Sequence, residues 1–146
     1  MSKTFYAGTF NPFTIGHKSI VDRALAIFDT VTIGVGYNVR KPESKEDADR
    51  RADAIRELFA KEPRVEVVCY GTLTTEAAKA AGADSLLRGV RNCTDFEYER
   101  SIAEVNRRLS GLDTILLFSL PEHDCISSSM VRELQAFGAD TTPYLP

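Results

Sequence analysis

Two hydroxyls and one imidazole lie close together near the start of the chain, where they could bind an anion. Thr9, Thr14 and His17 fall in the segment GTFNPFTIGH (8–17), between a short apolar run and a stretch with apolar residues at helical spacing. A helix that begins in such a loop directs free backbone N–H groups and a partial positive charge at it, which favours phosphate. The segment matches neither GxxxxGK[ST] nor GxGxxG. The alternative is a tight Asn-Pro turn with a solvated His17.

Two arginines, Arg88 and Arg91, flank Gly89-Val90 at the end of another apolar run. Guanidinium groups bind phosphate oxygens through two parallel hydrogen bonds, so two of them within one turn could clamp a dense anion. The alternative is that both arginines form surface ion pairs with the acids that follow, such as Asp95 or Glu99. Acids in the first turns of a helix also favour its dipole, and among them Glu99 is the candidate for a ligand contact.

Three serines, Ser127 to Ser129, open the last expected helix. Hydroxyls at a helix start either cap the helix or donate, with the backbone N–H groups, to a phosphate. Because no Glu or Gln completes a capping box, we expect this helix start to be less occupied by its own side chains. Lys41, in the loop after the second apolar run, is either solvated or a further cation for the same ligand. Two phosphate-binding loops with three cations indicate a nucleoside triphosphate.

These residues are carried by apolar runs that alternate with amphipathic segments along the whole chain. Strands are expected at 4–7, 30–37, 64–70, 85–87 and 114–118, and helices at about 17–28, 46–60, 73–81, 95–109 and 126–137. Such an alternation predicts right-handed crossovers and a parallel sheet with helices on both faces. The expected fold class is α/β, a doubly wound five-stranded parallel sheet of Rossmann-like type, in one domain over residues 1–146.

The apolar stripes of two helices predict which side of each helix faces the sheet. In the second helix the stripe consists of Ala52, Ile55, Leu58 and Phe59. In the fourth helix it consists of Phe96, Ile102, Val105 and Leu109. Gly82 follows the third helix, where a left-handed cap is expected.

Parallel strands end at the same edge of a sheet, and open sheets bind their ligands at that edge. The candidate residues all fall there, whereas ordinary surface residues would be scattered over both edges. In chain order, the strand ends carry Thr9 and His17, Asn38 to Lys41, Leu73 and Thr74, Arg88 and Arg91, and His123 to Ser129.

The composition argues against several other classes of protein. With 146 residues, 43% of them apolar and 27% charged, the chain is typical of a globular domain. A net charge of -3 argues against binding to nucleic acid. No long apolar run and no leader-like segment occurs, so we expect neither a membrane span nor secretion, and the cytoplasm is the expected location. The cysteines Cys69, Cys93 and Cys125 fit reduced thiols, and a metal site built from protein ligands is not expected.

The chain lacks the residue patterns on which several hydrolytic reactions depend. No nucleophile stands beside a base as in a Ser/His/Asp triad, and no carboxylate pair is spaced as in a glycosidase. Phosphoryl or nucleotidyl transfer needs neither. If the attacking group is a phosphate, its second pKa of about 6 leaves it mostly ionised at neutral pH, so no general base is required. Charge stabilisation and in-line positioning would then supply the catalysis.

The loop with Gly8-Thr9-Phe10-Asn11-Pro12 and Thr14-Ile15-Gly16-His17 resembles the signature of the nucleotidyltransferase superfamily whose members carry a (H/T)xGH loop. One family within it, the bacterial phosphopantetheine adenylyltransferases, is similar in Arg88–Arg91, Asp95–Glu99 (DFEYE), Asn106-Arg107 and Ile126–Ser129. The similarity covers nearly the whole chain, and DFEYE after RGxR is more specific than the loop. It implies transfer of AMP from ATP to 4′-phosphopantetheine, which gives dephospho-coenzyme A and pyrophosphate in coenzyme A biosynthesis.

The resemblance also implies roles for individual residues. His17, Lys41 and Arg91 would be catalytic, with His17 binding the ATP phosphates and stabilising the transition state. The phosphopantetheine would be held by Thr9, Lys41, Thr74 and Arg88. The ATP site would consist of Thr9, Phe10, His17, Gly89, Val90, Arg91, Glu99, His123, Asp124, Cys125, Ile126, Ser127, Ser128 and Ser129.

The resemblance further implies Mg²⁺ bound mainly through the ATP phosphates, and a homohexamer. Two questions stay open at this point. The loop Asn-Val-Arg-Lys-Pro (38–42) leaves either Arg40 or Lys41 as the functional cation. Asn11 stands where this family usually has Asp and also occurs in nicotinate-nucleotide relatives. A nicotinate or nicotinamide mononucleotide adenylyltransferase is therefore an alternative, and so is a nucleotide-binding module without catalysis.

Overall fold

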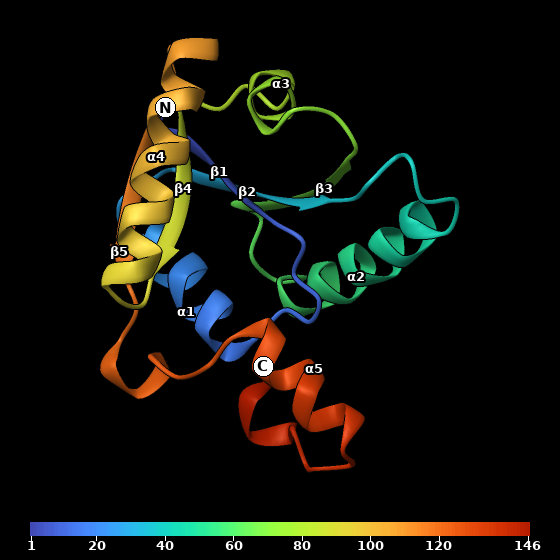
Figure 1. The fold of residues 1–146 in the computed structure, drawn as a ribbon. Helices are drawn as coiled ribbons and strands as arrows, with labels where there is room; N and C mark the ends of the chain where they lie inside the picture. Colours follow the sequence, from blue (N-terminus) through green and yellow to red (C-terminus); the bar gives the residue numbers. More distant parts are fainter.

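The computed structural model describes residues 1–146, with a sheet of five parallel strands at its centre (Figure 1). The strands lie in the order β3-β2-β1-β4-β5, so the chain builds outward from β1 to one edge and then restarts at β4 on the other side. The point where the winding reverses lies between β1 and β4. The predicted doubly wound sheet is thus confirmed. Its strands are β1 (Lys3–Gly8), β2 (Thr30–Gly36), β3 (Val65–Tyr70), β4 (Ser85–Val90) and β5 (Asp113–Phe118).

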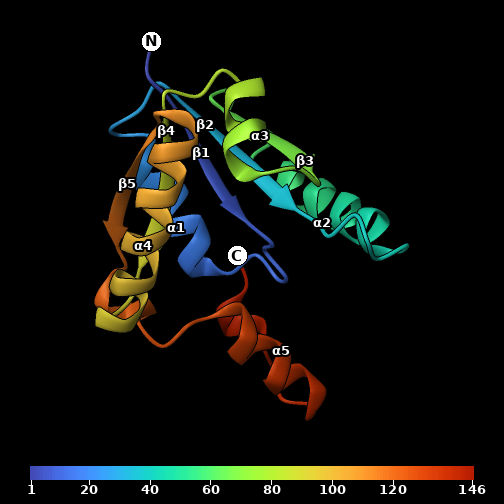
Figure 2. The ribbon, with the colours of Figure 1, turned by 45° about the horizontal axis from the view of Figure 1, so that its top comes forward.

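Helices cover both faces of the sheet. The core on one face takes its buried side chains from α1 and α2, and α3 and α4 lie on the other face (Figures 1 and 2). Helix α5 lies beyond the carboxyl ends of the strands (Figure 2). The helices are α1 (Ile15–Ala24), α2 (Ser44–Leu58), α3 (Thr74–Ala80), α4 (Cys93–Ser110) and α5 (Ser128–Ala136), with 3₁₀ turns at Pro121–His123 and Thr142–Tyr144. No helix combines the length and the apolar character that crossing a bilayer requires.

The core surrounds β1, in which residues 4–7 are at most 6% exposed. The central residues of β2 are buried as well, as its apolar run predicts. Phe5 of β1 packs directly on Gly34 of β2, where a Cβ would lie 2.2 Å from Cζ of Phe5. Only a glycine at position 34 leaves room for this ring. Tight packing at the sheet centre therefore fixes β1, the strand that leads into the candidate site.

The prediction of which residues of α4 face the sheet is wrong. Val105 and Leu109 are 56% and 60% exposed, Phe96 and Ile102 are also exposed, and the one buried residue of the helix is Glu99. The apolar stripe does exist, but at 100° per residue Val105 and Leu109 lie about 120° and 80° away from Glu99 around the helix axis. The helix turns Glu99 toward the sheet because this carboxylate pairs with an arginine of β4, and the stripe is left without a partner in the chain.

The buried stripe of α2 is confirmed for Ala52 and Ile55, and the adjoining Phe59 is also buried. Leu58 was predicted to join it, but it is 39% exposed. Helix α2 ends at Leu58, and Phe59 leaves the helical path as its C-cap and turns into the core. Termination of the helix therefore overrides its apolar periodicity at this position.

Two element bounds differ from the predicted ones. Helix α1 ends at Ala24 and not near Phe28, because the following residues form a turn that leads directly into β2. Strand β4 continues through Val90, so Arg88 is a strand residue whose direction is set by the pleat of the sheet. The left-handed cap after α3 is confirmed, since Gly82 has φ of +75°.

Candidate active site

The loop between β1 and α1 takes its shape from Phe10. This residue has φ of +50°, in the left-handed region that non-glycine residues rarely adopt, and it is 3% exposed. Its ring lies over Gly8, where a Cβ would come within 2.9 Å of Cζ of Phe10. Edge-to-face contacts join the ring to Tyr6 and His17, with centroid distances of 5.1 and 5.0 Å. The side chain of Phe10 therefore acts by packing, and it orients the imidazole.

His17 is the third residue of α1 and forms a capping box with Thr14. The backbone N–H of His17 donates to Oγ1 of Thr14 (3.3 Å), and the backbone N–H of Thr14 donates to Nδ1 of His17 (2.9 Å). Thr14 is thus used as a cap. Because Nδ1 accepts a hydrogen bond, the proton of the neutral ring is on Nε2.

Burial and two nearby positive charges keep the His17 ring neutral. Burial lowers its pKa from 6.5 to about 4, and the positive charges of Arg88 and Arg91 contribute to this shift. At pH 7 the ring carries no charge and offers Nε2–H as its free donor. A neutral donor of this kind can bind a phosphate oxygen without a change in protonation.

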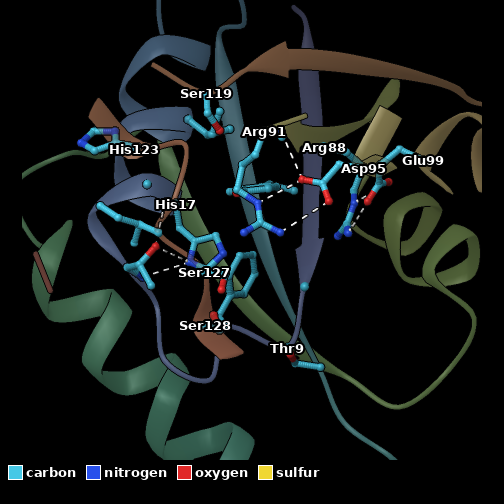
Figure 3. A pocket seen from close by; sticks show the side chains of 18 of the residues that line it. Thr9, His17, Arg88, Arg91, Asp95, Glu99, Ser119, His123, Ser127 and Ser128 are labelled. Carbon is cyan, nitrogen blue, oxygen red and sulfur yellow. Dashed lines mark hydrogen bonds and ion pairs between the residues drawn. The ribbon is translucent and has the colours of Figure 1, made fainter. Parts of the chain in front are cut away.

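A cavity of about 340 Å³ opens beside His17 at the carboxyl ends of β1 and β4 (Figure 3). Its walls come from the β1–α1 loop, the end of β4, the start of α4 and the segment that enters α5. Most of the predicted ATP-site residues line it, which brings together segments far apart in the sequence. They are Thr9, Phe10, His17, Gly89, Arg91, Glu99, His123, Ile126 and Ser127 to Ser129, together with Arg88.

Arg88 and Arg91 reach this cavity while paired with acids of α4 (Figure 3). Nε of Arg91 donates to Asp95 at 3.0 Å, and Arg88 donates to both oxygens of Glu99 at 2.9 and 2.7 Å. The ion pairs considered as an alternative therefore exist, but they lie in the cavity wall, where Glu99 is 6% exposed. Arg88 also donates to the carbonyl of Ala7. Of the five N–H groups of a guanidinium, two remain free on Arg88 for a ligand.

A second cavity, of about 330 Å³, adjoins the first. Both cavities are lined by Thr9, Arg88 and Glu99, so these side chains stand at the boundary. Thr74, a predicted substrate residue, lines only the second cavity, where its hydroxyl is 3.0 Å from that of Tyr70. Other parts of the wall are Ile102, Asn106 and Thr114, and Oγ1 of Thr114 is buried without a hydrogen-bond partner.

The sequence predicts that few side chains of α5 bond to the backbone at the start of this helix, and this prediction is wrong. Oγ of Ser127 accepts from the backbone N–H of Met130 at 3.1 Å and caps the helix. Ser128 donates to the carbonyl of Pro12 at 2.7 Å, which ties α5 to the β1–α1 loop. The missing Glu or Gln prevents a capping box, but a single serine is sufficient for the cap. Direct ligand contacts from this segment therefore depend on the remaining hydroxyl and backbone groups.

Four predicted residues line neither cavity. Val90, Asp124 and Cys125 are neighbours of lining residues, whereas Lys41 lies apart in the exposed loop after β2. The backbone of Lys41 belongs to a turn, with its N–H bonded to the carbonyl of Asn38 at 3.0 Å. Its side chain makes no ion pair within the chain, and the choice between Arg40 and Lys41 stays a prediction.

Among the further residues that line the first cavity, three carry a hydroxyl and were not predicted as site residues: Tyr6, Tyr98 and Ser119. Ser119 directly follows β5, so the rule that strand ends meet at one edge would have identified it. Tyr98 stands next to Glu99 in the DFEYE block. Tyr6 lies inside an apolar run that is buried on both faces, and there only its hydroxyl distinguishes it from a core residue.

The chain offers no protein-built metal site. No group of three or more His, Cys, Asp or Glu side chains is placed to hold a metal ion. The two carboxylates in the first cavity, Asp95 and Glu99, are engaged by arginines. The three cysteines are free thiols. A cation in this cavity would therefore take its ligands mainly from a bound anion.

Known proteins resemble the chain in both sequence and fold. The sequence model of the cytidylyltransferase-like family matches residues 5–134. The chain is 49% identical to a phosphopantetheine adenylyltransferase of Phocaeicola vulgatus and 44% identical to one of Bacteroides thetaiotaomicron. Both matches cover all 146 residues of the chain and 96% of the relative.

Two solved structures that resemble the chain are named as adenylyltransferases for other acceptors. A putative nicotinate-nucleotide adenylyltransferase from Vibrio parahaemolyticus has a TM-score of 0.64 at 18% identity and covers 99% of the chain and 94% of its own length. A bifunctional NMN adenylyltransferase/ADP ribose pyrophosphatase from Francisella tularensis has a TM-score of 0.69 at 15% identity, over 99% of the chain and 44% of its own. These identities support the fold alone. The family is decided by the far higher full-length identities: the chain belongs to the cytidylyltransferase-like family and, within it, to the phosphopantetheine adenylyltransferases.

Proposed function

We propose that the chain transfers the adenylyl group of ATP to 4′-phosphopantetheine, giving dephospho-coenzyme A and pyrophosphate. The observation that carries this proposal is the pair of adjoining cavities that share Thr9 and Arg88. An adenylyltransferase must hold two phosphorylated molecules with their reacting groups in contact. Two cavities that meet at a hydroxyl and a guanidinium provide such an arrangement. The kinship with phosphopantetheine adenylyltransferases identifies the acceptor.

In the reaction, a phosphate oxygen of the acceptor attacks the α-phosphorus of ATP from the side of the second cavity. The bond between the α-phosphorus and the bridging oxygen breaks, and pyrophosphate leaves with the electron pair. The attacking phosphate is already ionised, so the site needs no general base. Catalysis then comes from in-line positioning and from donors aimed at the developing charge.

His17 and Arg91 are the residues that stabilise this charge in the proposed mechanism. Nε2–H of His17 is a preorganised neutral donor, because the capping box with Thr14 fixes both the tautomer and the ring. Arg91 is held by Asp95 beside it and supplies positive charge. The first turn of α1 adds unpaired backbone N–H groups. Thr9 and Arg88 hold the acceptor phosphate at the cavity boundary.

The acceptor extends into the second cavity, past Thr74. Lys41 is proposed to approach the reacting phosphates when both substrates are bound, because its loop follows β2 at the same edge of the sheet. The unpaired hydroxyl of Thr114 and the amide of Asn106 suit an acceptor that carries amide groups. The ATP contacts are proposed for the residues named in the sequence analysis, including Val90, Asp124 and Cys125 through their backbone.

Magnesium is proposed to enter with ATP, bound to the phosphates. The residues of the first cavity fit this form, since both carboxylates there are engaged by arginines and leave the cation to phosphate oxygens and water. When bound, the cation would neutralise charge on the leaving pyrophosphate. A neighbouring solved structure from Francisella tularensis is described as complexed with AMP and a manganese ion.

The exposed stripe of α4 supports assembly into a homo-oligomer, for which we propose a hexamer by family resemblance. Val105 and Leu109, one turn apart on α4, are each more than half exposed. Apolar patches of this kind on a small domain mark interaction surfaces. Sedimentation velocity should show a species larger than the 16.2 kDa chain, and Val105→Asp should shift it toward the monomer. The 146 residues are proposed to act as one domain in the cytoplasm, where free thiols stay reduced.

The assay that tests the function is release of pyrophosphate from ATP and magnesium. Release should depend on added 4′-phosphopantetheine. Turnover with nicotinate mononucleotide in its place would show the alternative acceptor and contradict the proposal. Calorimetric binding of ATP without product from either acceptor would indicate a binding module.

A further inference from the structure

Tyr6 is a polar residue of the first cavity for which the proposed mechanism has no role. It lies in β1 between Ile33 of β2 and Leu87 of β4, and it is 4% exposed. Its hydroxyl has no hydrogen-bond partner in the chain and is not one of the fully buried unpaired atoms, so it is accessible from the cavity that the residue lines. A hydroxyl that faces a cavity in this way is available to a partner from outside the chain.

The neighbours of Tyr6 direct its hydroxyl toward the cavity. The ring packs edge to face on Phe10, at 5.1 Å between centroids, and lies 6.4 Å from the ring of His17. Gly89 of β4 leaves the space beside the hydroxyl free, since a Cβ there would lie 4.0 Å from Oη of Tyr6 and 3.3 Å from Cγ1 of Ile20. All these residues line the same cavity.

The hydroxyl keeps its proton under the conditions of the reaction. Burial raises the pKa of Tyr6 well above its usual value of 10, and this effect outweighs the positive charge of Arg88. Tyr6 is therefore a donor at neutral pH and does not act as a base. A donor that faces the cavity without a partner in the chain suits a ligand with many acceptor oxygens, and the sugar and phosphates of a nucleotide carry such oxygens.

We propose that the hydroxyl of Tyr6 donates a hydrogen bond to a sugar or phosphate oxygen of the nucleotide in this cavity, beside Nε2–H of His17. The inference rests on the proposed function, since it takes ATP as the occupant. It makes Tyr6 a nucleotide-binding residue that adds to the donors of α1 and β4.

The test is Tyr6→Phe, which removes only the hydroxyl, with Tyr144→Phe in the C-terminal 3₁₀ turn as the matched control. Calorimetry with ATP and magnesium, without acceptor, measures the nucleotide affinity. We expect the Kd for ATP to rise by about 2- to 10-fold, the range of one neutral hydrogen bond. The KM for 4′-phosphopantetheine should stay unchanged, and Tyr144→Phe should match the wild type.

Thermal unfolding separates binding from a structural role. Without ATP, Tyr6→Phe should unfold at the same temperature as the wild type, because the hydroxyl has no hydrogen-bond partner in the chain. With ATP, the rise in Tm should be smaller than for the wild type. An equal loss of Tm with and without ATP would assign the hydroxyl to the fold and overturn the inference. If Tyr6→Phe binds ATP as tightly as the wild type, the inference about Tyr6 is overturned and the proposed function is not. If the wild type binds no ATP, the proposed function is overturned as well.

Discussion

Replacing His17 should separate its structural role from its chemical role. His17→Ala removes the acceptor of the Thr14 N–H and the Nε2–H donor together. An unpaired N–H at a helix start costs roughly 1–2 kcal/mol, within the range of lost caps. For a domain of this size that corresponds to a decrease in Tm of about 3–6 °C. Loss of one preorganised donor to the transition state should lower kcat by about 10²–10³.

His17→Gln is the matched variant, because Gln is a natural residue at the third position of a capping box. Its side-chain oxygen can accept from the Thr14 N–H, so the Tm should return to within about 1 °C of the wild type. The imidazole donor is still missing, so kcat should stay low. Thermal unfolding and pyrophosphate release, measured on the same preparations, provide both readouts.

Two results would refute this reasoning about His17. Wild-type turnover in His17→Gln would show that the imidazole donor is not needed in the transition state. An unchanged Tm in His17→Ala would show that the bond from the Thr14 N–H to Nδ1 contributes nothing to the helix start. Loss of both stability and turnover in both variants would mean that Gln cannot replace the cap, and the two roles would then not be separable at this position.

Three other perturbations follow from the contacts already described. The neutral His17 ring contributes its full stabilisation above pH 6.5, and this contribution is lost as the pH falls to about 4, because the unfolded chain binds the proton at a higher pH than the folded chain. In a pH series of thermal unfolding, the wild type should therefore lose more stability than His17→Gln. Arg88→Ala should raise the KM for 4′-phosphopantetheine, and because Glu99 loses its partner it should also lower stability, by less than the roughly 3–5 kcal/mol of a fully buried pair. Adding Glu99→Gln should restore the stability but not the KM. An effect on the KM for ATP alone would assign Arg88 to the nucleotide and not to the acceptor. Gly34→Ala should lower the free energy of unfolding by about 1–3 kcal/mol in urea, because its Cβ meets Phe5, and Phe5→Leu in the same chain should recover part of it.

The sheet and the location of the site could be predicted because they depend on order along the chain. Strands that alternate with helices can form few topologies, and strand ends then meet at one edge. That rule placed His17 and Arg91 at one cavity, although 74 positions separate them in the sequence. The identity of the acceptor substrate was predicted from the resemblance in the DFEYE block, because the periodicity of apolar residues carries no information about a substrate.

Details that depend on a partner in space could not be predicted in the same way. The rotation of α4 follows from the attraction between Glu99 and Arg88, and an apolar stripe alone suggests the wrong face. Periodicity also does not show which nitrogen of His17 carries the proton, since this depends on the Thr14 N–H. Tyr6 lies in a strand that is buried on both faces, and such a strand has no alternation from which a hydroxyl that faces the cavity could be predicted.

Asp95 and Glu99 are separated by one turn of α4, so a single helix holds both guanidinium groups in the wall of the first cavity. Val105 and Leu109 project from the same helix toward solvent. At 1.5 Å per residue, Val105 and Leu109 lie about 9 and 15 Å further along the helix axis than Glu99, so a neighbouring subunit docked on them would contact the same helix that holds both arginine pairs. Quaternary contacts and substrate affinity would then be linked through the rotational setting of one helix.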